Sequence, residues 1–199
     1  MRLDGRSLPS TIHDPEKAAR HYRPNRELRI AVNTALAVGA PLLLTGEPGT
    51  GKTAVAYHLA WFFGTRVFRF QVRSSSTAQD LKYDFDAVGY LRYAQRREEG
   101  EGHRTRRDFL YERALWDAYV YQDGTPILLI DEIDKAPRDF PNDLLLELDE
   151  QCFPHPFPKE KRDDEGEVIK PPEGISPVVI ITSNAERRLP DAFLRRCVL

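Results

Sequence analysis

One eight-residue segment constrains the fold of this chain more than any other feature. Residues 46–53 read Gly-Glu-Pro-Gly-Thr-Gly-Lys-Thr and lie between an apolar block, Pro41–Thr45, and a segment with helical spacing, Gly51–Phe63. The eight residues match G-x-x-x-x-G-K-[ST] at every fixed position, and a strand before and a helix after are the context that this motif requires. Glycines permit left-handed turns and close approach of a ligand, so backbone N–H groups can surround an anion. The segment therefore predicts a strand-to-helix loop that binds phosphate groups.

Each residue type in this loop suits that chemistry. The predicted binding residues are Gly46, Glu47, Pro48, Gly49, Thr50, Gly51, Lys52 and Thr53. The positive end of the following helix dipole points at the same place. Lys52 supplies a charge for the β- and γ-phosphates, and Thr53 offers a hydroxyl to Mg²⁺. The alternative is a glycine-rich turn with an incidental lysine.

The remaining apolar residues indicate an α/β fold. They come in short, nearly continuous blocks, as in strands of a parallel sheet that is covered on both faces. The predicted strands are Pro41–Thr45, Val67–Val72, Pro126–Ile130 and Pro177–Ile181. Val67–Val72 is interrupted by Arg69 and Gln71, which is typical of an edge strand. Four segments have helical spacing: Asn25–Val38, Gly51–Phe63, Asp108–Tyr121 and Phe140–Gln151. Charged, Gly and Pro residues dominate Arg92–Arg107 and Phe153–Pro172, which we predict to be exposed insertions.

Composition limits the location and the partners of the chain. Its 199 residues include 29 Lys and Arg against 31 Asp and Glu, a formal net charge of −2. This near balance makes nucleic acid an unexpected partner and disfavours an anionic membrane surface. Cys152 and Cys197 lie far apart without metal-ligand neighbours, which favours a reducing, cytoplasmic location. Met1–Ser10 is too charged for a secretory signal, and no apolar run is long enough for a membrane span, so we expect a soluble protein with no membrane partner.

Two adjacent acids, Asp131 and Glu132, follow the third apolar block. Open α/β sheets bind ligands at the carboxyl ends of their strands, and neighbouring strand residues point to opposite faces. The two side chains can therefore address different points. We predict that Asp131 supports Mg²⁺ through its water shell and that Glu132 polarises an attacking water as general base. Taken alone, the two acids could merely end a strand.

Two further motifs complete a family resemblance. The last apolar block ends in Thr182-Ser183-Asn184, and Leu189–Cys197 reads LPDAFLRRC. Together with GEPGTGKT and LLIDEIDKA, in this order, these segments resemble the AAA+ ATPases and, within them, the MoxR-like branch. The resemblance covers most of Pro24–Leu199. It implies the P-loop NTPase fold, in which a parallel sheet is sandwiched by helices.

The resemblance also implies roles for single residues. Residues 46–53 become the Walker A loop, and Asp131 and Glu132 become the Walker B pair. Asn184 becomes the sensor-1 amide that holds the lytic water, and its strand lies between the Walker A and Walker B strands. From the residues alone, Asn184 could instead be a turn residue.

The arginine finger falls on Arg195 or Arg196, and we favour Arg196. The family presents this residue across a subunit interface, where it is worth about 10³ to 10⁵ in rate. From the sequence alone, the two arginines could be solvated surface charges.

The function implied by the resemblance is binding and hydrolysis of ATP with Mg²⁺. The enzyme is expected to be a homo-oligomer, a hexameric ring, that remodels a partner protein and hydrolyses poorly as a monomer. MoxR-like ATPases resemble chaperones that work with proteins carrying a von Willebrand A-type domain, so such a partner is implied. A nucleotide-gated assembly switch would use the same residues. A small-molecule kinase is the third class, but it does not need the Asp-Glu pair with a water-holding Asn. An N-K-x-D motif for guanine is absent, which favours ATP.

Aromatic residues pose two open questions. Tyr22 and Pro24 stand where such ATPases surround the adenine, so Tyr22 could stack on the base or instead pack under the first helix. Tyr83, Phe85, Tyr90 and Tyr93 could grip a partner in a pore or instead pack under a hairpin.

The expected organisation is a lead-in over 1–23 and a nucleotide-binding α/β subdomain over 24–199. Cys197–Leu199 reads as the start of a further strand. The helical lid of AAA+ proteins would follow it, so we expect a chain truncated before the lid.

Overall fold

The computed structural model describes residues 19–95, 104–158 and 167–199. At its centre is a four-stranded sheet with the order β1-β8-β5-β2, in which every pairing is parallel. The strands are β1 (Leu42–Thr45), β2 (Val67–Gln71), β5 (Ile127–Asp131) and β8 (Val178–Ser183). The predicted α/β class is confirmed, as is the edge position of β2. Strand β8 lies between β1 and β5, as the resemblance implied.

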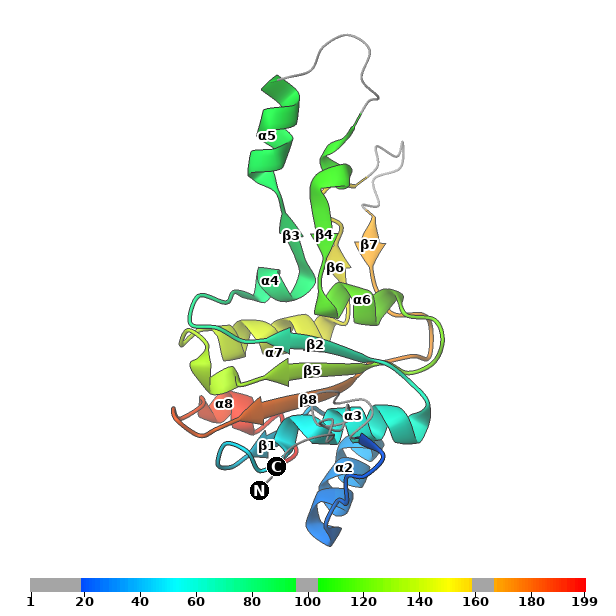
Figure 1. The fold of residues 1–199 in the computed structure, drawn as a ribbon, viewed down its shortest axis with the longest axis vertical. Coiled ribbons are helices and arrows are strands. Elements are labelled where there is room, and N and C mark those ends of the chain that lie inside the picture. The colour runs from blue at the N-terminus through cyan, green and yellow to red at the C-terminus, as the bar shows by residue number, and fades with distance from the viewer. Residues whose placement is uncertain (1–18, 96–103, 159–166) are drawn as a thin grey trace, which may run out of the picture.

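Helices cover both faces of this sheet (Figure 1). They are α2 (Arg26–Val38), α3 (Lys52–Phe63), α6 (Ala114–Val120) and α7 (Phe140–Glu150). The Asn25 side chain caps α2 by accepting from the Leu28 N–H, and left-handed Gly39 ends it. On β5, Ile127 and Leu129 pack with α2 and α3, whereas Leu128 and Ile130 pack with α6 and α7. The sheet is therefore apolar on both faces, which explains its continuous apolar blocks.

Strand alternation also selects the side chains at the carboxyl edge. The register pairs Arg69 with Leu129 and Gln71 with Asp131, and paired residues of parallel strands point to the same face. Leu129 packs on the side of α3. Arg69, Gln71 and Asp131 therefore share the face that carries the N-terminus of α3, and Thr182, two residues beyond Ile180 on β8, shares it as well.

The segment between β2 and α6 differs from its prediction. It forms α4 (Ala78–Lys82), β3 (Tyr83–Phe85), α5 (Ala87–Gln95), the 3₁₀ helix η2 (Arg106–Phe109) and β4 (Leu110–Glu112). The predicted helix over Asp108–Tyr121 is confirmed over Ala114–Val120, as α6, but its first half is wrong. Residues Leu110–Glu112 form β4 and pair antiparallel with β3 instead. A nonlocal pairing of this kind overrides helical spacing and is invisible to a local pattern.

A second hairpin, β6 (Phe153–Pro154) with β7 (Val168–Ile169), lies beside the first (Figure 1). Arg107 joins the two insertions, because it donates to the Phe157 carbonyl at 2.7 Å and pairs with Glu167. Phe153 is 3% exposed and His155 is buried. The prediction of two wholly exposed insertions is therefore wrong at these positions. Residues 96–103 and 159–166 lie outside the described residues.

The aromatic residues of the first insertion contact other rings. Tyr83 meets Trp116, Phe85 meets Phe157, and both Tyr90 and Tyr93 meet Phe109. This arrangement favours the packing alternative over a pore-lining role. No helix in the described part of the chain is both long and apolar enough to cross a membrane.

Candidate functional site

The predicted phosphate loop connects β1 to α3. Gly46, Gly49 and Gly51 have φ of 150°, 81° and 86°, a region that favours glycine. Gly51 is also the N-cap of α3. No side chain among the described residues caps this helix. The Ala54 N–H donates to the Gly51 carbonyl, and the N–H groups of Lys52 and Thr53 at the helix start can face an anion. The loop backbone thus fits the recognition of phosphate.

Lys52, the candidate for phosphate charge, and Thr53, the candidate for the metal, both make hydrogen bonds within the site. Lys52 Nζ donates to the carbonyl oxygens of Gly46 and Glu47, both at 2.8 Å. Thr53 Oγ1 donates to Asp131 Oδ1 at 3.0 Å. The ammonium therefore lies within the loop, and the hydroxyl joins the loop to the end of β5.

Asp131 is a buried carboxylate with partners on both oxygens. Its residue is 3% exposed. Oδ1 accepts from Thr53 and, at 2.6 Å, from Thr182 Oγ1, while Oδ2 accepts from Arg69 Nη2 at 2.5 Å. A buried charge needs such compensation, because leaving it unpaired would cost several kcal/mol. The structure thus brings Asp131 together with Thr53, as the sequence predicted for a metal site.

Glu132 leaves the strand in a left-handed turn, with φ of 62°. Its separation from Asp131 therefore comes from this turn and not from strand alternation, on which the sequence argument relied. Oε2 accepts from Gln71 Nε2 at 2.7 Å and from Lys135 Nζ at 2.6 Å, and Oε1 accepts from Asn184 Nδ2 at 3.3 Å. A residue other than glycine in the left-handed region is strained, and such strain is concentrated at functional sites.

Asn184 follows β8 and is fixed by a second buried acid, Asp134 of the 3₁₀ helix η3 (Ile133–Lys135). Asp134 accepts from the Asn184 N–H at 3.0 Å and the Glu186 N–H at 3.2 Å. Burial raises the pKa of Asp134, but these backbone hydrogen bonds and one from the Ser183 side chain lower the pKa by more, so that the net shift is downward. Asp134 therefore positions the turn that carries Asn184.

We expect Asp134→Asn to unfold more easily than the parent by about 2–4 kcal/mol, because an amide would turn a donor toward groups that donate. The lowered pKa means that the Asp134 contribution is fully present above the unfolded-state value near 4 and is lost as the pH falls through the lower folded value. Chemical denaturation at pH 7 measures the loss. Asp139→Asn, an exposed acid nearby, is the control, and equal stability of the two variants would contradict the role of Asp134.

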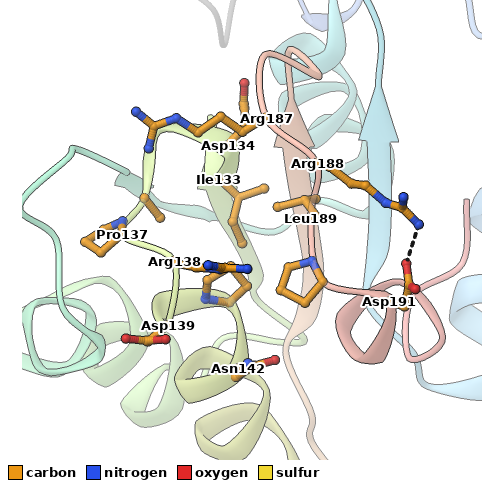
Figure 2. A pocket seen from close by; sticks show the side chains of 13 residues that line it. Ile133, Asp134, Pro137, Arg138, Asp139, Asn142, Arg187, Arg188, Leu189 and Asp191 are labelled. Carbon is orange, nitrogen blue, oxygen red and sulfur yellow. Dashed lines mark hydrogen bonds and ion pairs between the residues drawn. The ribbon is translucent and has the colours of Figure 1, made fainter.

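A groove of about 690 Å³ lies beyond η3 (Figure 2). It runs between the start of α7 and the segment leading into α8 (Asp191–Leu194). Figure 2 shows Ile133 and Leu189 in its wall, with Arg188 turned toward Asp191 at 3.0 Å. None of the residues predicted for nucleotide or metal lines this groove. It therefore adjoins the candidate site without being part of it.

The donors of the site suit Mg²⁺ and a triphosphate. Mg²⁺ prefers oxygen ligands, keeps several waters, and is held by one or two carboxylates together with substrate phosphates. Thr53 and Asp131 supply a hydroxyl and a carboxylate in contact. The described residues contain no cluster of three or more His, Cys, Asp or Glu side chains for a metal. A hydrated Mg²⁺ held by these residues would neutralise phosphate charge.

Of the two candidate arginine fingers, Arg196 lies at the far end of the sheet from this site within the chain. Arg196 pairs with Asp149 of α7, Nη1 to Oδ2 at 3.2 Å. It lines a cavity with Pro41 and Pro177, at the amino ends of β1 and β8. Arg195 is exposed. Neither side chain is brought together with Lys52, Glu132 or Asn184, which lie at the opposite ends of the strands.

Tyr22 lies beside the loop and contacts α3. Its ring centroid is 5.5 Å from that of His58, and a side chain at Gly51 would meet Tyr22 Cε2 at 3.3 Å. Tyr22, Pro24 and His58 line an apolar cavity of about 180 Å³. Burial raises the pKa of Tyr22. Both alternatives for this tyrosine, stacking on a base and packing under α2, remain compatible with its place.

Four residues of the site were missed by the sequence argument: Arg69, Gln71, Lys135 and Thr182. Each contacts Asp131 or Glu132. A signal for two of them was present, because Arg69 and Gln71 interrupt an apolar strand at alternate positions. That pattern was interpreted only as evidence for an edge strand.

The comparisons with known proteins identify a family and a fold. Residues 41–197 match the model of the AAA domain, dynein-related subfamily. Lon protease from Finegoldia magna is 30% identical over 165 residues, which cover 79% of this chain and 18% of that protein. Lon protease from Borrelia duttonii is 28% identical over 163 residues, which cover 79% of this chain and 17% of that protein. The chain thus spans less than a fifth of the length of these relatives.

A solved structure from Cytophaga hutchinsonii, named a "putative ATPase", has a similar fold. The TM-score is 0.50 and the identity 16%, and the match covers 84% of this chain and 42% of that one. The family model spans most of the chain, and the matched residues include 46–53, Asp131, Glu132 and Asn184. The chain therefore belongs to the AAA domain family, dynein-related subfamily, and so to the AAA+ ATPases.

Proposed function

We propose that this chain binds ATP with Mg²⁺ at residues 46–53 and hydrolyses it. One observation carries the proposal: hydrogen bonds connect all the catalytic motifs except the arginines. Thr53 of the loop and Thr182 of β8 share Asp131 Oδ1, and Asn184 donates to Glu132. Phosphoryl transfer to water requires phosphate binding, metal binding and water activation within one small volume, and these contacts support that requirement.

The proposed roles follow from the groups present. The loop N–H groups and Lys52 hold the phosphates, and Thr53 with Asp131 holds the metal. Glu132 accepts a proton from water as its oxygen attacks the γ-phosphorus, and the bond to the β,γ-bridging oxygen breaks to leave ADP. Asn184 orients that water with its amide. Gln71 and Lys135, which contact Glu132 Oε2, would have to leave that oxygen accessible for proton transfer.

We further propose that the active form is a ring, hexameric in the MoxR-like manner, in which Arg195 or Arg196 of one copy completes the site of the next. The support is geometric: Arg196 pairs with Asp149 at the amino ends of the strands, away from the site of its own chain, and Arg195 is exposed. Tyr22 is proposed for the base. Remodelling of a protein, in particular one with a von Willebrand A-type domain, belongs to the same proposal. So do the division at residue 23 and a cytoplasmic location, which two free thiols support.

A mixing experiment tests the shared site. We expect the double variant Arg195→Ala/Arg196→Ala to release phosphate slowly, because its own base lacks a neighbour's guanidinium. We also expect Glu132→Gln to be inactive while keeping both arginines. Mixing the two proteins should restore turnover well above the sum of the separate rates, up to about 10³-fold over the double variant.

Phosphate release across a range of mixing ratios, alongside mass photometry, measures this complementation. Additive rates at every ratio would contradict a finger supplied in trans. Transfer of phosphate to a small acceptor would instead support the kinase class. Nucleotide-dependent assembly that no protein partner stimulates would support the assembly switch.

A further inference from the structure

The side chain of Arg69 connects the two catalytic acids of the site. Its Nη2 donates to Asp131 Oδ2 and to Gln71 Oε1, both at 2.5 Å. The Gln71 amide passes the connection on, because Nε2 donates to Glu132 Oε2 at 2.7 Å. One guanidinium on β2 thus contacts the predicted metal carboxylate directly and the predicted base through one amide.

We propose that Arg69 is the counter-ion that compensates Asp131 before Mg²⁺ arrives. Arg69 therefore opposes metal binding, and it couples metal binding to Gln71, the residue that hydrogen-bonds to Glu132. This inference rests on the proposed function, because it assumes a metal at Asp131 and a base at Glu132.

Burial and charge favour this role over a purely structural ion pair. The Asp131 side chain is 4% exposed and that of Arg69 is 44% exposed. A buried carboxylate needs a cation nearby, whereas a half-exposed guanidinium on an edge strand can return to water at little cost. The Lys52 ammonium does not contact Asp131, because its bonds go to the loop carbonyls. Among the described residues, Arg69 makes the ion pair with this acid.

A divalent cation near Thr53 and Asp131 changes this balance. It would compensate the carboxylate itself and would repel the positive charge of Arg69. Metal binding must therefore either weaken the Arg69–Asp131 ion pair or be weakened itself by repulsion from the Arg69 guanidinium. Weakening the pair also weakens the hydrogen bond from Arg69 to Gln71 Oε1. The Gln71 amide is then less firmly held, and so is its hydrogen bond to Glu132 Oε2. Arg69 is a positioning residue in this scheme, since it acts through Asp131 and Gln71.

The test measures how much Mg²⁺ is needed for binding of a fluorescent ADP, which requires no hydrolysis. We expect Arg69→Gln to lower the half-saturating Mg²⁺ concentration on the order of tenfold, because a like charge next to the metal is gone. Arg69→Lys keeps the charge and should stay near the parent value. Arg66→Gln removes an exposed cation just before β2, beside Asp117 of α6 and away from Asp131, and is the charge control.

A fold readout keeps this test interpretable. In EDTA, we expect Arg69→Gln to have a lower unfolding temperature than Arg66→Gln, because Asp131 loses its counter-ion. Adding Mg²⁺ with ADP should raise the unfolding temperature of Arg69→Gln by more than that of Arg66→Gln. If Arg69→Gln needs as much Mg²⁺ as the parent, or more, the inference is wrong. If the parent itself binds ADP without any response to Mg²⁺, the proposed metal site is wrong instead, and the two failures are therefore distinguishable.

Discussion

Glu132→Gln is expected to abolish turnover while leaving ATP binding nearly unchanged. The amide has the size of the carboxylate but cannot take a proton from water, and general bases contribute about 10²- to 10⁴-fold in rate. It also keeps an oxygen for the hydrogen bond from Asn184. Phosphate release under saturating ATP measures the rate, and calorimetry with ATP measures the affinity.

The matched control for this prediction is Glu186→Gln. Glu186 is an exposed acid on the turn after β8, two residues from Asn184, and only its backbone N–H contacts Asp134. It should keep the parent rate. Turnover of Glu132→Gln at the parent rate would show that the base is another group.

Lys52→Met is expected to weaken ATP binding by about 10²- to 10⁴-fold. Hydrogen bonds to a charged group contribute about 1.5–3 kcal/mol each, and two such bonds to phosphate oxygens give this range. The hydrogen bonds that Lys52 Nζ makes within the described residues go to two carbonyls of its own loop, so the loss should be specific to the ligand. Calorimetric titrations with ATP, ADP and AMP provide the measurement.

AMP provides an internal control, because it lacks the β- and γ-phosphates that Lys52 is proposed to contact. Its affinity should change little, while those for ATP and ADP fall together. The exposed Lys170→Met serves as the charge control in the protein. A uniform loss for all three nucleotides would point to a damaged loop, and no loss for any would remove Lys52 from the site.

Much of the fold could be predicted because its signals are local. The four strands of the sheet are apolar blocks, and α2 carries Asn25 and Gly39 at its ends, where capping residues are expected. Strands β3 and β4 were not predicted, and β4 was included in a helix, because the two strands are short and depend on each other. Three paired residues give no periodic pattern of their own.

The candidate site divides in the same way. Lys52, Thr53, Asp131 and Glu132 stand in contiguous motifs, which predicted both their identity and their convergence. Two of their partners come from other strands, Gln71 on β2 and Thr182 on β8, whereas Lys135 is three residues from Glu132 in the same motif. Identification of Gln71 and Thr182 required the strand register, which the sequence does not contain. The left-handed turn at Glu132 is also a tertiary result, since nothing about a glutamate favours it.

The alternation along the strands has a consequence for how this protein can be altered. Core residues and site residues follow the same two-residue alternation along β5. Leu129 and Asp131 point to one face of the sheet, and Leu128 and Ile130 point to the other. Deleting or inserting a single residue within β5 would turn Asp131 toward α6 and α7 and expose leucines to the phosphates. Changes of length within the strands would therefore destroy the site, and libraries aimed at new partners should keep the strands unbroken and vary exposed segments outside the sheet.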